Sequence, residues 1–563
     1  MANTNRIYGI DLGTTYSCIS YLDENNRPVV IAGDNNRLVT PSVVYFEPNN
    51  VIVGETAKEY ARVEPDRTVA LVKRYMGDST WKKDISGTKY RPEEISSYIL
   101  LKLKKAAEDA LGDEVTDVVI TVPAYFSSAE RTATEQAGQL AGLKVHDLIP
   151  EPMAAAIAYA VNEVEDQTVM VYDLGGGTFD ITVLNVSQGN RVAVICTDGI
   201  HALGGQDWDD RIVNHLAEVW QQENGYETHP LDDPQTAQDL NSAAENAKIN
   251  LSNREQVPIT VQHGAGRTRV ELTREKFDEL TADLLTRTID LTKKILEVAK
   301  SKGHAQLDKV LLVGGSTYMP QVKGRLATEV PGIPIEAFDP DQCVAKGAAI
   351  YGSNIQIREA YAQAIADTLG EDVSLSDVDA LPAEQKDRIA QEALKNLPGN
   401  ITLAALEDGR TQEIVNACSK NFGVIVLLSE GGDGIQWMIK KNDQVPANKG
   451  NQFATAYDNQ SGALIQIVEG NGDDFEDVEH LPEGEDSLPS YAKKIGNMQL
   501  ELPPNLPKGS PFTITYSLSN DGGRLRAEGQ EDTGGTKCET EIDEVGALTP
   551  EEISSRIGAM AVT

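Results

Sequence analysis

The pattern of apolar residues changes along the chain. In its first part, short apolar runs alternate with segments in which apolar residues recur at helical spacing. Residues 117–143 predict a strand, a proline turn and a helix, and residues 151–161 predict an alanine-rich helix. Residues 277–303 predict a longer amphipathic helix that stops at Gly303. Strands alternating with helices are typical of an α/β domain, which we expect to occupy residues 1–353.

After the α/β part, the pattern becomes first helical and then all-β. Residues 354–415 predict an inserted connector with two helices, around 355–369 and 383–396. Residues 416–543 contain short runs of alternating apolar and polar residues, interrupted by Gly, Pro, Asn and Asp. This alternation predicts a small antiparallel β-sandwich.

The last part of the chain, residues 544–563, predicts one short helix. Thr549 is suited to cap it, Pro550 to occupy its first position, and Glu552 to complete a capping box. We therefore expect the helix to begin at Pro550.

Apolar strands end in glycine-rich turns at three places. The segment VMVYDLGGGTFDITVL, residues 169–184, places Asp173 and three consecutive glycines between two strand-forming runs. The segment IYGIDLGTTYS, residues 7–17, repeats the order of strand, Asp11, Leu and Gly. The third turn lies in VLLVGGSTYMP, residues 310–320. The repeated Asp-Leu-Gly turn indicates an internal duplication with two similar α/β halves.

These turns have the chemistry of a phosphate site. Glycines let backbone N–H groups approach a ligand closely, and threonine hydroxyls add further donors. Two aspartates would repel a polyphosphate unless a cation lay between them, and Mg²⁺ is held by this combination of carboxylates and phosphates. The spacings GxxxxGK and GxGxxG are absent from the turns, so we expect neither a P-loop nor a dinucleotide-binding fold. We predict a nucleotide held between two lobes.

Charge and cysteine content narrow the range of partners and locations. The chain has 563 residues, with 50 Lys and Arg against 87 Asp and Glu, a formal net charge of −37. This argues against non-specific binding to nucleic acid or to an anionic membrane. The five cysteines are scattered without a CxxC pair, which favours a reducing, cytoplasmic location. The first strand begins near Arg6 and no apolar run could span a bilayer, so we expect no signal peptide and no membrane segment.

Six segments, in order, resemble one known family. They are GIDLGTTYS, VITVPAYF, EPMAAAIAYA, DLGGGTFDITVL, LLVGGST and VAKGAAIYG, and the match covers residues 5–352. Together they resemble the ATPase domain of the seventy-kilodalton heat-shock chaperones, the DnaK family, whose wider relatives are actin and the sugar kinases. A second stretch, from NFGVIV at residue 421 to RLRAEG at residue 529, resembles the β-sandwich that holds extended peptides in the same chaperones.

The resemblance implies a fold, an activity and partners. The fold would be a multidomain one, an α/β actin-like (duplicated ribonuclease-H-like) ATPase domain followed by a small all-β peptide-binding sandwich. The activity would be slow, Mg²⁺-dependent hydrolysis of ATP to ADP, coupled to the binding of extended apolar segments of unfolded proteins. Besides these segments, the family uses a J-domain co-chaperone and a nucleotide-exchange factor, whereas nucleic acid and membranes are not expected.

The resemblance also assigns roles to residues of the cleft. Asp11 and Asp173 would hold Mg²⁺ through its waters. The catalytic residues around the γ-phosphate and the attacking water would be Lys73, Glu151, Asp173, Thr178 and Asp180. The phosphates and the adenosine would be held by Gly13, Thr14, Thr15, Tyr16, Gly175, Gly176, Gly177, Gly204, Gly205, Glu245, Lys248, Ser252, Gly314, Gly315, Ser316, Tyr318 and Asp341.

In the β-sandwich, the resemblance implies a groove that binds peptides in an extended conformation. Its lining would be Phe422, Val424, Leu427, Phe453, Ala456, Ala463 and Ile465. Some of these residues alternate along a strand and therefore face one side together. They fit the core of the sandwich equally well, and the sequence leaves both interpretations open.

The chain departs from the family pattern at several positions. Where the family clamps adenine between two arginines, this sequence has Ile249 and Tyr318, and Tyr318 can stack on a base. The family's leucine-rich linker is replaced by EIVNACS, residues 413–419, after the inserted helices. Asp147 stands where the family has the basic residue that engages J-domains. We also expect no α-helical lid after the short C-terminal helix.

Other functions remain open beside the chaperone. An ATP-switched scaffold or assembly factor for one specific partner is favoured by the altered linker and by Asp147. A sugar or acid kinase is less compatible with a β-sandwich after residue 416, because a kinase needs its acceptor pocket in the cleft. An inactive relative of the ATPases is disfavoured, because the catalytic residues are all present.

Overall fold

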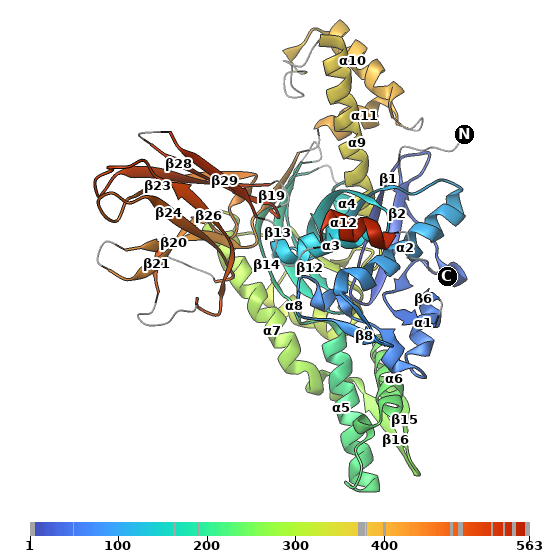
Figure 1. Ribbon diagram of the computed structural model, residues 1–563. Helices are drawn as coiled ribbons and strands as arrows, with labels where there is room; N and C mark the ends of the chain where they lie inside the picture. The colour runs from blue at the N-terminus through green and yellow to red at the C-terminus, as the bar shows by residue number, and fades with distance from the viewer. Residues whose placement is uncertain are drawn as a thin grey trace.

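The computed structural model has three parts (Figure 1). An α/β body, blue to green, carries a projection of helices, yellow to orange, and a β-sandwich, orange to red, lies beside it. The structure describes residues 6–48, 50–161, 165–187, 191–369, 378, 380–397, 401–411, 413–428, 431–472, 477–481, 488–519, 522–532, 535–542 and 548–557.

The α/β body contains two sheets with matching topology. The first has the order β11-β10-β1-β2-β3, and the second contains the order β18-β17-β12-β13-β14. In the first sheet, β1 is parallel to β10 and antiparallel to β2. In the second, β12 is likewise parallel to β17 and antiparallel to β13, as an internal duplication predicts. The strands are β1 (Ile7–Asp11), β2 (Tyr16–Leu22), β3 (Pro28–Val30), β10 (Asp117–Val122), β11 (Lys144–Pro150), β12 (Gln167–Leu174), β13 (Phe179–Ser187), β14 (Arg191–Ile200), β17 (Lys309–Val313) and β18 (Ile335–Ala337).

Helices cover both sheets and separate them. α2 and α3 pack on the first sheet, and α5 to α8 pack against the second. α4 and α9 lie between the sheets, in a third cluster of apolar residues. The helices are α2 (Pro92–Leu111), α3 (Ser128–Leu140), α4 (Glu151–Ala160), α5 (Gly205–Asn224), α6 (Pro234–Leu251), α7 (Arg274–Ser301), α8 (Pro320–Glu329) and α9 (Cys343–Leu369).

Smaller elements complete the two lobes. One group, near the first sheet, consists of β4 (Thr40–Pro41), β5 (Val44–Phe46), β6 (Val51–Val53), α1 (Glu55–Tyr60), β7 (Thr68–Val69), β8 (Lys83–Ile85) and β9 (Thr88–Tyr90). The hairpin of β15 (Gln256–His263) and β16 (Gly266–Thr273) packs against α5 and α6 on the other lobe.

The alanine-rich sequence of α4 follows from how closely α9 approaches it. A Cβ atom on Gly347 of α9 would lie 1.7 Å from the carbonyl oxygen of Ala154. On the other side, a Cβ atom on Gly9 of β1 would lie 2.1 Å from the backbone nitrogen of Ala349. Only small residues allow this contact, and it fixes α9 between the two lobes.

The inserted residues form three helices rather than two. The predicted helix at 355–369 is the second half of α9, so the domain boundary that we placed after residue 353 lies inside one continuous helix. Gly352, Ser353 and Asn354 are buried inside this helix, and a Cβ atom on Gly352 would lie 2.7 Å from Ile7 Cγ2. α10 (Ala383–Lys395) matches its prediction, whereas α11 (Leu403–Thr411) was missed.

The β-sandwich has two antiparallel sheets around an apolar core. One sheet has the order β25-β21-β20-β24-β26, and the other has the order β23-β27-β28-β29. The strands are β20 (Asn421–Leu427), β21 (Asp433–Ile439), β23 (Ala447–Ala454), β24 (Gly462–Gly470), β25 (Val478–His480), β26 (Ala492–Glu501), β27 (Pro511–Leu518), β28 (Leu525–Glu531) and β29 (Lys537–Glu541).

The predicted C-terminal helix is present as α12 (Pro550–Ile557) and packs on α3. Thr549 and Glu552 form the expected capping box. The Gln136 side chain donates to the carbonyl oxygen of Leu548 (2.9 Å) and accepts from its N–H (3.1 Å). No helix among the described residues combines the length and the apolarity needed to cross a bilayer.

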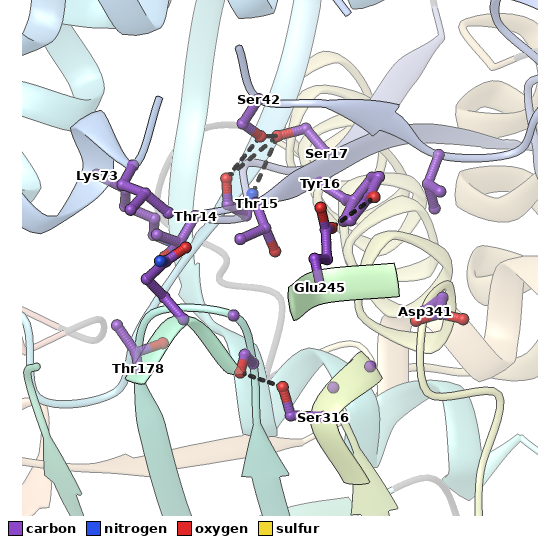
Figure 2. Close-up of a pocket in the computed structure, with 18 of the residues that line it drawn as sticks. Thr14, Thr15, Tyr16, Ser17, Ser42, Lys73, Thr178, Glu245, Ser316 and Asp341 are labelled. Atoms are coloured by element: carbon purple, nitrogen blue, oxygen red, sulfur yellow. Dashed lines mark hydrogen bonds between the residues drawn. The ribbon is translucent and has the colours of Figure 1, made fainter. Parts of the chain in front are cut away.

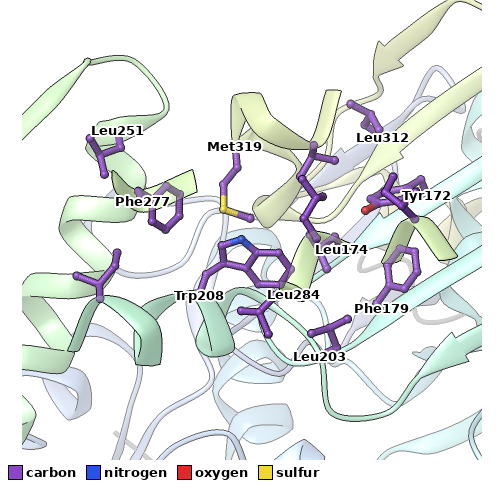
Figure 3. Packing of buried hydrophobic residues seen from close by; sticks show 14 of the residues in the cluster. Tyr172, Leu174, Phe179, Leu203, Trp208, Leu251, Phe277, Leu284, Leu312 and Met319 are labelled. Atoms are coloured by element: carbon purple, nitrogen blue, oxygen red, sulfur yellow. The ribbon is translucent and has the colours of Figure 1, made fainter. Parts of the chain in front are cut away.

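The core of the second lobe surrounds a buried tryptophan, Trp208 (Figure 3). We expect Trp208→Ala to lower the free energy of unfolding by about 3–5 kcal/mol, because it leaves a large cavity among well-packed residues. Tyr226→Ala is the control, since that aromatic side chain is 72% exposed. Urea unfolding of the two variants measures the difference, and equal midpoints would contradict this packing.

Candidate functional site

A cavity of about 560 Å³ lies between the two lobes, where β1 and β12 end (Figure 2). Thr14 and Thr15 enter it from the first lobe, and Thr178 and Ser316 lie on the other side. The predicted residues that line the cavity are Asp11, Gly13, Thr14, Thr15, Tyr16, Lys73, Glu151, Asp173, Gly175, Gly176, Thr178, Glu245, Lys248, Gly314, Gly315, Ser316, Tyr318 and Asp341. The structure therefore brings together most of the cleft residues that the sequence predicted.

Five predicted residues do not line the cavity. They are Gly177, Asp180, Gly204, Gly205 and Ser252. The three glycines and Asp180 support the lining from behind, whereas Ser252 is the C-terminal cap of α6.

The glycine turn of the second lobe touches the threonine turn of the first. A Cβ atom on Gly176 would lie 2.2 Å from Thr15 Oγ1, and one on Gly177 would lie 2.4 Å from Thr14 Cγ2. Behind the turn, the backbone N–H of Gly205 donates to the carbonyl oxygen of Gly175 (2.9 Å). Close approach thus requires glycine at positions 176 and 177, whereas a Cβ atom on Gly175 would lie no nearer than 3.7 Å to its neighbours.

The turn of the first lobe is held by two serines that the sequence reasoning missed. The Gly13 N–H donates to Ser17 Oγ (3.1 Å), and the Ser42 hydroxyl donates to the Gly13 carbonyl (2.8 Å). The two serine oxygens are 2.9 Å apart. A hydroxyl residue four positions after a glycine is a weak local signal, and Ser42 comes from a different element, so only the fold reveals this support.

A buried ion pair lies at the phosphate end of the cavity. Lys73 Nζ is 2.5 Å from Glu151 Oε1, and the two residues are 5% and 7% exposed. Lys73 belongs to the short helix Val72–Tyr75, which begins after Leu71. The backbone of Leu71 is left-handed, with a φ of 58°, and this bend directs the helix toward the cavity. Because breaking a buried pair leaves a buried charge, each partner fixes the other.

The carboxylates here outnumber the cations. Burial, together with the charge of Glu151, raises the pKa of Asp11 to about 7. The same two causes raise the pKa of Asp173 and the pKa of Asp180 well above the usual range of an aspartate. Lys73 is the counter-charge that opposes these shifts. No cluster of three or more Asp, Glu, His or Cys side chains among the described residues is arranged to hold a metal ion, so a hard divalent cation here would need oxygen ligands beyond Asp11 and Asp173. Mg²⁺ would neutralise the excess charge, taking its other ligands from phosphate and water.

Asp180 is oriented by the first lobe although it belongs to the second. Its Oδ1 accepts a hydrogen bond from the backbone N–H of Ala124 (3.0 Å), in the loop after β10. Its Oδ2 is buried and has no hydrogen-bond partner among the described residues. Asp180 therefore links the two lobes directly beneath the cavity.

The other end of the cavity contains two lysine–carboxylate pairs. Lys58 Nζ is 2.6 Å from Glu245 Oε2 and donates to Tyr16 OH (3.0 Å). Lys248 Nζ is 2.6 Å from Asp209 Oδ2, and burial raises the pKa of Asp209 to about 6. The sequence analysis missed Lys58 and Asp209, because each is an ordinary charged helix residue until the fold closes the cavity.

Two large apolar side chains stand at the mouth of the cavity. Ile249 is 54% exposed and Tyr318 is 50% exposed, although both belong to its lining. The Tyr318 hydroxyl donates to Asp341 Oδ2 (3.3 Å), which orients the ring. Exposed apolar groups at a pocket mouth are typical of a binding surface for a flat ligand.

The comparison with known families agrees with this geometry. The family model described as "Hsp70 protein" matches residues 7–86 and 78–430. The chain belongs to the Hsp70 family. Chaperone protein DnaK from two strains of Halobacterium salinarum is 33% identical over 557 residues, which are 98% of this chain and 77% of the relative. The resemblance of the six motifs to the DnaK family is confirmed, and the chain is an Hsp70-type, ATP-binding chaperone.

The predicted peptide groove of the β-sandwich is not assembled as expected. Phe422, Val424, Ala463 and Ile465 are buried in the core of the sandwich, so the core interpretation holds for these four. Phe453 and Ala456 are half-buried and Leu427 is 65% exposed. The alternation that suggested a groove is the ordinary alternation of a strand with one buried face.

β20 and β24 separate at one end. They pair from Asn421–Gly470 to Val424–Ile467, and no described residue continues the pairing beyond that point. Continued register would place Leu427 opposite Leu464, and Leu464 is 57% exposed. Two neighbouring strands thus present unpaired edges and exposed leucines, and the sequence analysis missed Leu464.

The linker is a strand, β19 (Ile414–Ala417), which extends the second sheet of the α/β body. It is parallel to β14 and antiparallel to β22 (Gln444–Val445) of the sandwich. Next to it, the Thr197 N–H donates to Asn442 Oδ1 (2.9 Å), and Lys441 Nζ is 2.7 Å from Asp198. The boundary that we placed before residue 416 lies inside this strand.

Asp147, the predicted departure at the J-domain position, has a partner of its own. Its Oδ2 accepts a hydrogen bond from the hydroxyl of Tyr351 in α9 (2.7 Å). The acidic side chain thus anchors the middle of α9 to β11.

A histidine–glutamate pair joins the lobes near the phosphate turn. His201 Nδ1 is 3.0 Å from Glu130 Oε1, and His201 Nε2 is 3.3 Å from the Arg74 carbonyl oxygen. The contact with Glu130 raises the pKa of His201. Burial raises the pKa of Glu130, but the bonds from His201 and Ser127 outweigh it and lower that pKa overall.

This pair predicts a pH-dependent stability. Because the pKa of His201 is raised, its contribution is complete below the unfolded value of about 6.5 and is lost as the pH rises through the folded pKa. We expect His201→Gln to lower the melting temperature at about pH 6 and to have little effect at about pH 9. Calorimetry across this range measures it, with His304→Gln as the control. A deficit independent of pH would contradict the pairing.

Proposed function

We propose that this chain hydrolyses ATP with Mg²⁺ in the cavity between the lobes and uses the nucleotide to control binding of extended apolar polypeptide segments. The observation that supports this proposal most strongly is the arrangement at the phosphate end of the cavity. There, two backbone turns face each other beside a buried lysine–glutamate pair and an excess of carboxylates. This combination suits a polyphosphate with its metal.

Each residue at the phosphate end has a role in this proposal. Asp11 and Asp173 would hold Mg²⁺, which supplies charge neutralisation at the transferring phosphoryl group. Lys73 provides a second positive charge, and Glu151 keeps it in place. Thr178 lines the cavity and orients the water that attacks the γ-phosphate, and Asp180 holds this segment in place from behind through the Ala124 N–H. Positioning and charge thus account for catalysis.

At the other end of the cavity, Glu245 and Lys248 face the ribose in this proposal. Tyr318 stacks on adenine, and Ile249 covers the opposite face. Neither side chain carries the charge of the two arginines that stand at these positions in the family. We therefore propose that base binding relies on stacking rather than on cation–π contacts.

The proposed peptide site lies where β20 and β24 separate. An extended segment can pair with the free strand edges, while its apolar side chains contact Leu427 and Leu464. Coupling to ATP uses the second sheet, because β12 and β13 of the nucleotide cavity and β19 of the linker belong to it. A J-domain co-chaperone and an exchange factor remain proposed partners.

The alternative is an ATP-switched scaffold for a single partner. The helical projection of α9 to α11 favours it, because it adds a folded module with its own apolar cluster next to the linker. A scaffold would bind few of the peptides in a diverse library, whereas a general chaperone would bind many.

Loss of the Lys73 charge tests the ATPase. We expect Lys73→Ala to lower kcat for ATP hydrolysis by about 10²-fold or more, because it removes a positive charge from the transition state. Release of radiolabelled phosphate measures the rate. Lys82→Ala is the matched control, since Lys82 is exposed and lies outside the cavity. Equal rates for both variants would exclude Lys73 from catalysis.

The separated strands give a second test. We expect Leu427→Asp together with Leu464→Asp to weaken binding of fluorescent apolar peptides about tenfold or more, since burial of a leucine is worth about 1.5–3 kcal/mol. The fold should be unaffected because both side chains are exposed. Leu403→Asp, on α11, is the control for an added surface charge. Unchanged anisotropy titrations in the double variant would place the peptide site elsewhere.

A further inference from the structure

The helical projection ends immediately before the linker strand. α11 ends at Thr411 and β19 begins at Ile414. Between them, the carbonyl oxygen of Glu413 already accepts a hydrogen bond from the Val192 N–H (2.9 Å), and its carboxylate is 3.1 Å from Arg191 Nε. Because the three steps from Thr411 to Ile414 span at most ~11 Å, the end of α11 limits where the linker strand can begin.

The same projection starts at the nucleotide cavity. Val344, in the first turn of α9, lines that cavity, and the first half of α9 is wedged between the lobes. α9 has 27 residues in one uninterrupted helix, which corresponds to a length of ~40 Å. The helix therefore runs from the cavity up into the projection, toward α10 (Figure 1).

α11 returns along α9 through a close contact at Gly409, where a larger residue would displace side chains of α9. A Cβ atom on Gly409 would lie 2.4 Å from Ile357 Cδ1 and 2.9 Å from Asn354 Oδ1, both on α9. Glycine weakens a helix interior relative to alanine. The close approach of the two helices gives a physical reason for its presence here.

Three side chains fasten the last turns of α11 to α9. The Tyr361 hydroxyl of α9 donates to Glu407 Oε1, and Arg410 donates to Glu407 Oε2 from Nη2 (2.8 Å) and from Nε (3.0 Å). The guanidinium of Arg410 lies 5.7 Å from the centre of the Tyr361 ring. The side chain of Arg410 is only 8% exposed and that of Glu407 is 45% exposed, so the guanidinium is buried between the two helices while the carboxylate reaches the surface directly before the linker.

We propose that the module formed by α9, α10 and α11 positions the linker strand β19 against β14. In this module, Gly409, Tyr361 and Arg410 are positioning residues. Displacement of α11 from α9 moves the start of β19 away from Val192 and weakens docking of the strand. The consequence for ATP-dependent peptide release rests on the proposed function, whereas the docking of β19 can be measured without it.

The test compares two glycine substitutions, each made in the full chain. Gly409→Leu pushes α11 off α9, and Gly324→Leu in α8 is the matched control, because no atom lies within 4 Å of its added Cβ. Hydrogen exchange of the amides of residues 414–417 is followed by mass spectrometry. We expect exchange to be at least ~10-fold faster in Gly409→Leu than in the wild type and unchanged in the control. Equal protection of these amides in Gly409→Leu and the wild type would overturn the proposal.

A compensating variant separates displacement from misfolding. Ile357→Ala makes room for the new side chain, so Gly409→Leu combined with Ile357→Ala should recover protection of residues 414–417. Tyr361→Phe should accelerate exchange by a smaller factor, because it removes one hydrogen bond. Without recovery in the double variant, α11 packing is not what holds the strand, and the proposal fails.

Measurements of ATP turnover and of nucleotide-dependent peptide affinity distinguish this inference from the proposed function. In Gly409→Leu, basal ATP turnover should stay within about twofold of wild type, because the change lies outside the cavity. The ratio of peptide affinities with ADP and with ATP should fall toward one. If the wild type itself shows no ATP effect on peptide binding, the proposed coupling is wrong, and the exchange experiment still decides whether the module docks β19.

Discussion

The phosphate turn and the linker belong to one hydrogen-bonded sheet, and the rest of the structure depends on this continuity. β12 and β13 carry the turn at Gly175–Gly177, β14 follows them, and β19 and β22 extend the same sheet to the sandwich. Strands in a sheet cannot move independently without loss of backbone hydrogen bonds. This shared sheet is the physical route by which the proposed movement of the turn would reach the linker, two strands away.

Buried charge explains why this arrangement needs a ligand. Asp11, Asp173, Asp180 and Glu151 surround one lysine, Lys73, and burial raises the pKa of the three aspartates. An excess of buried carboxylates opposes closure of the two lobes on each other. In the proposed function, Mg²⁺ is the cation that lies between these carboxylates and the phosphates, so that nucleotide binding and lobe closure would stabilise each other.

The sequence predicted the local chemistry better than the long-range contacts. The glycine turns and the α12 cap were readable because each is a short motif with a local cause, whereas cavity residues such as Lys73 and Glu245 were named only through the resemblance to the family. Ser42 and Lys58 were missed, because their roles depend on a partner far along the chain. The groove residues Phe422 and Ile465 show the opposite error, since alternation along a strand does not tell a core from a binding face. The uninterrupted α9 was hidden by small residues that close packing requires.

The most direct measurement is the affinity of the full chain for fluorescent apolar peptides with Mg·ATP and with Mg·ADP. Thr178→Ala slows turnover so that the ATP state persists during the titration. If the sheet connects the cavity to the sandwich, we predict weaker binding and faster dissociation with ATP than with ADP. Identical affinities and dissociation rates in the two states would contradict the coupling through the shared sheet.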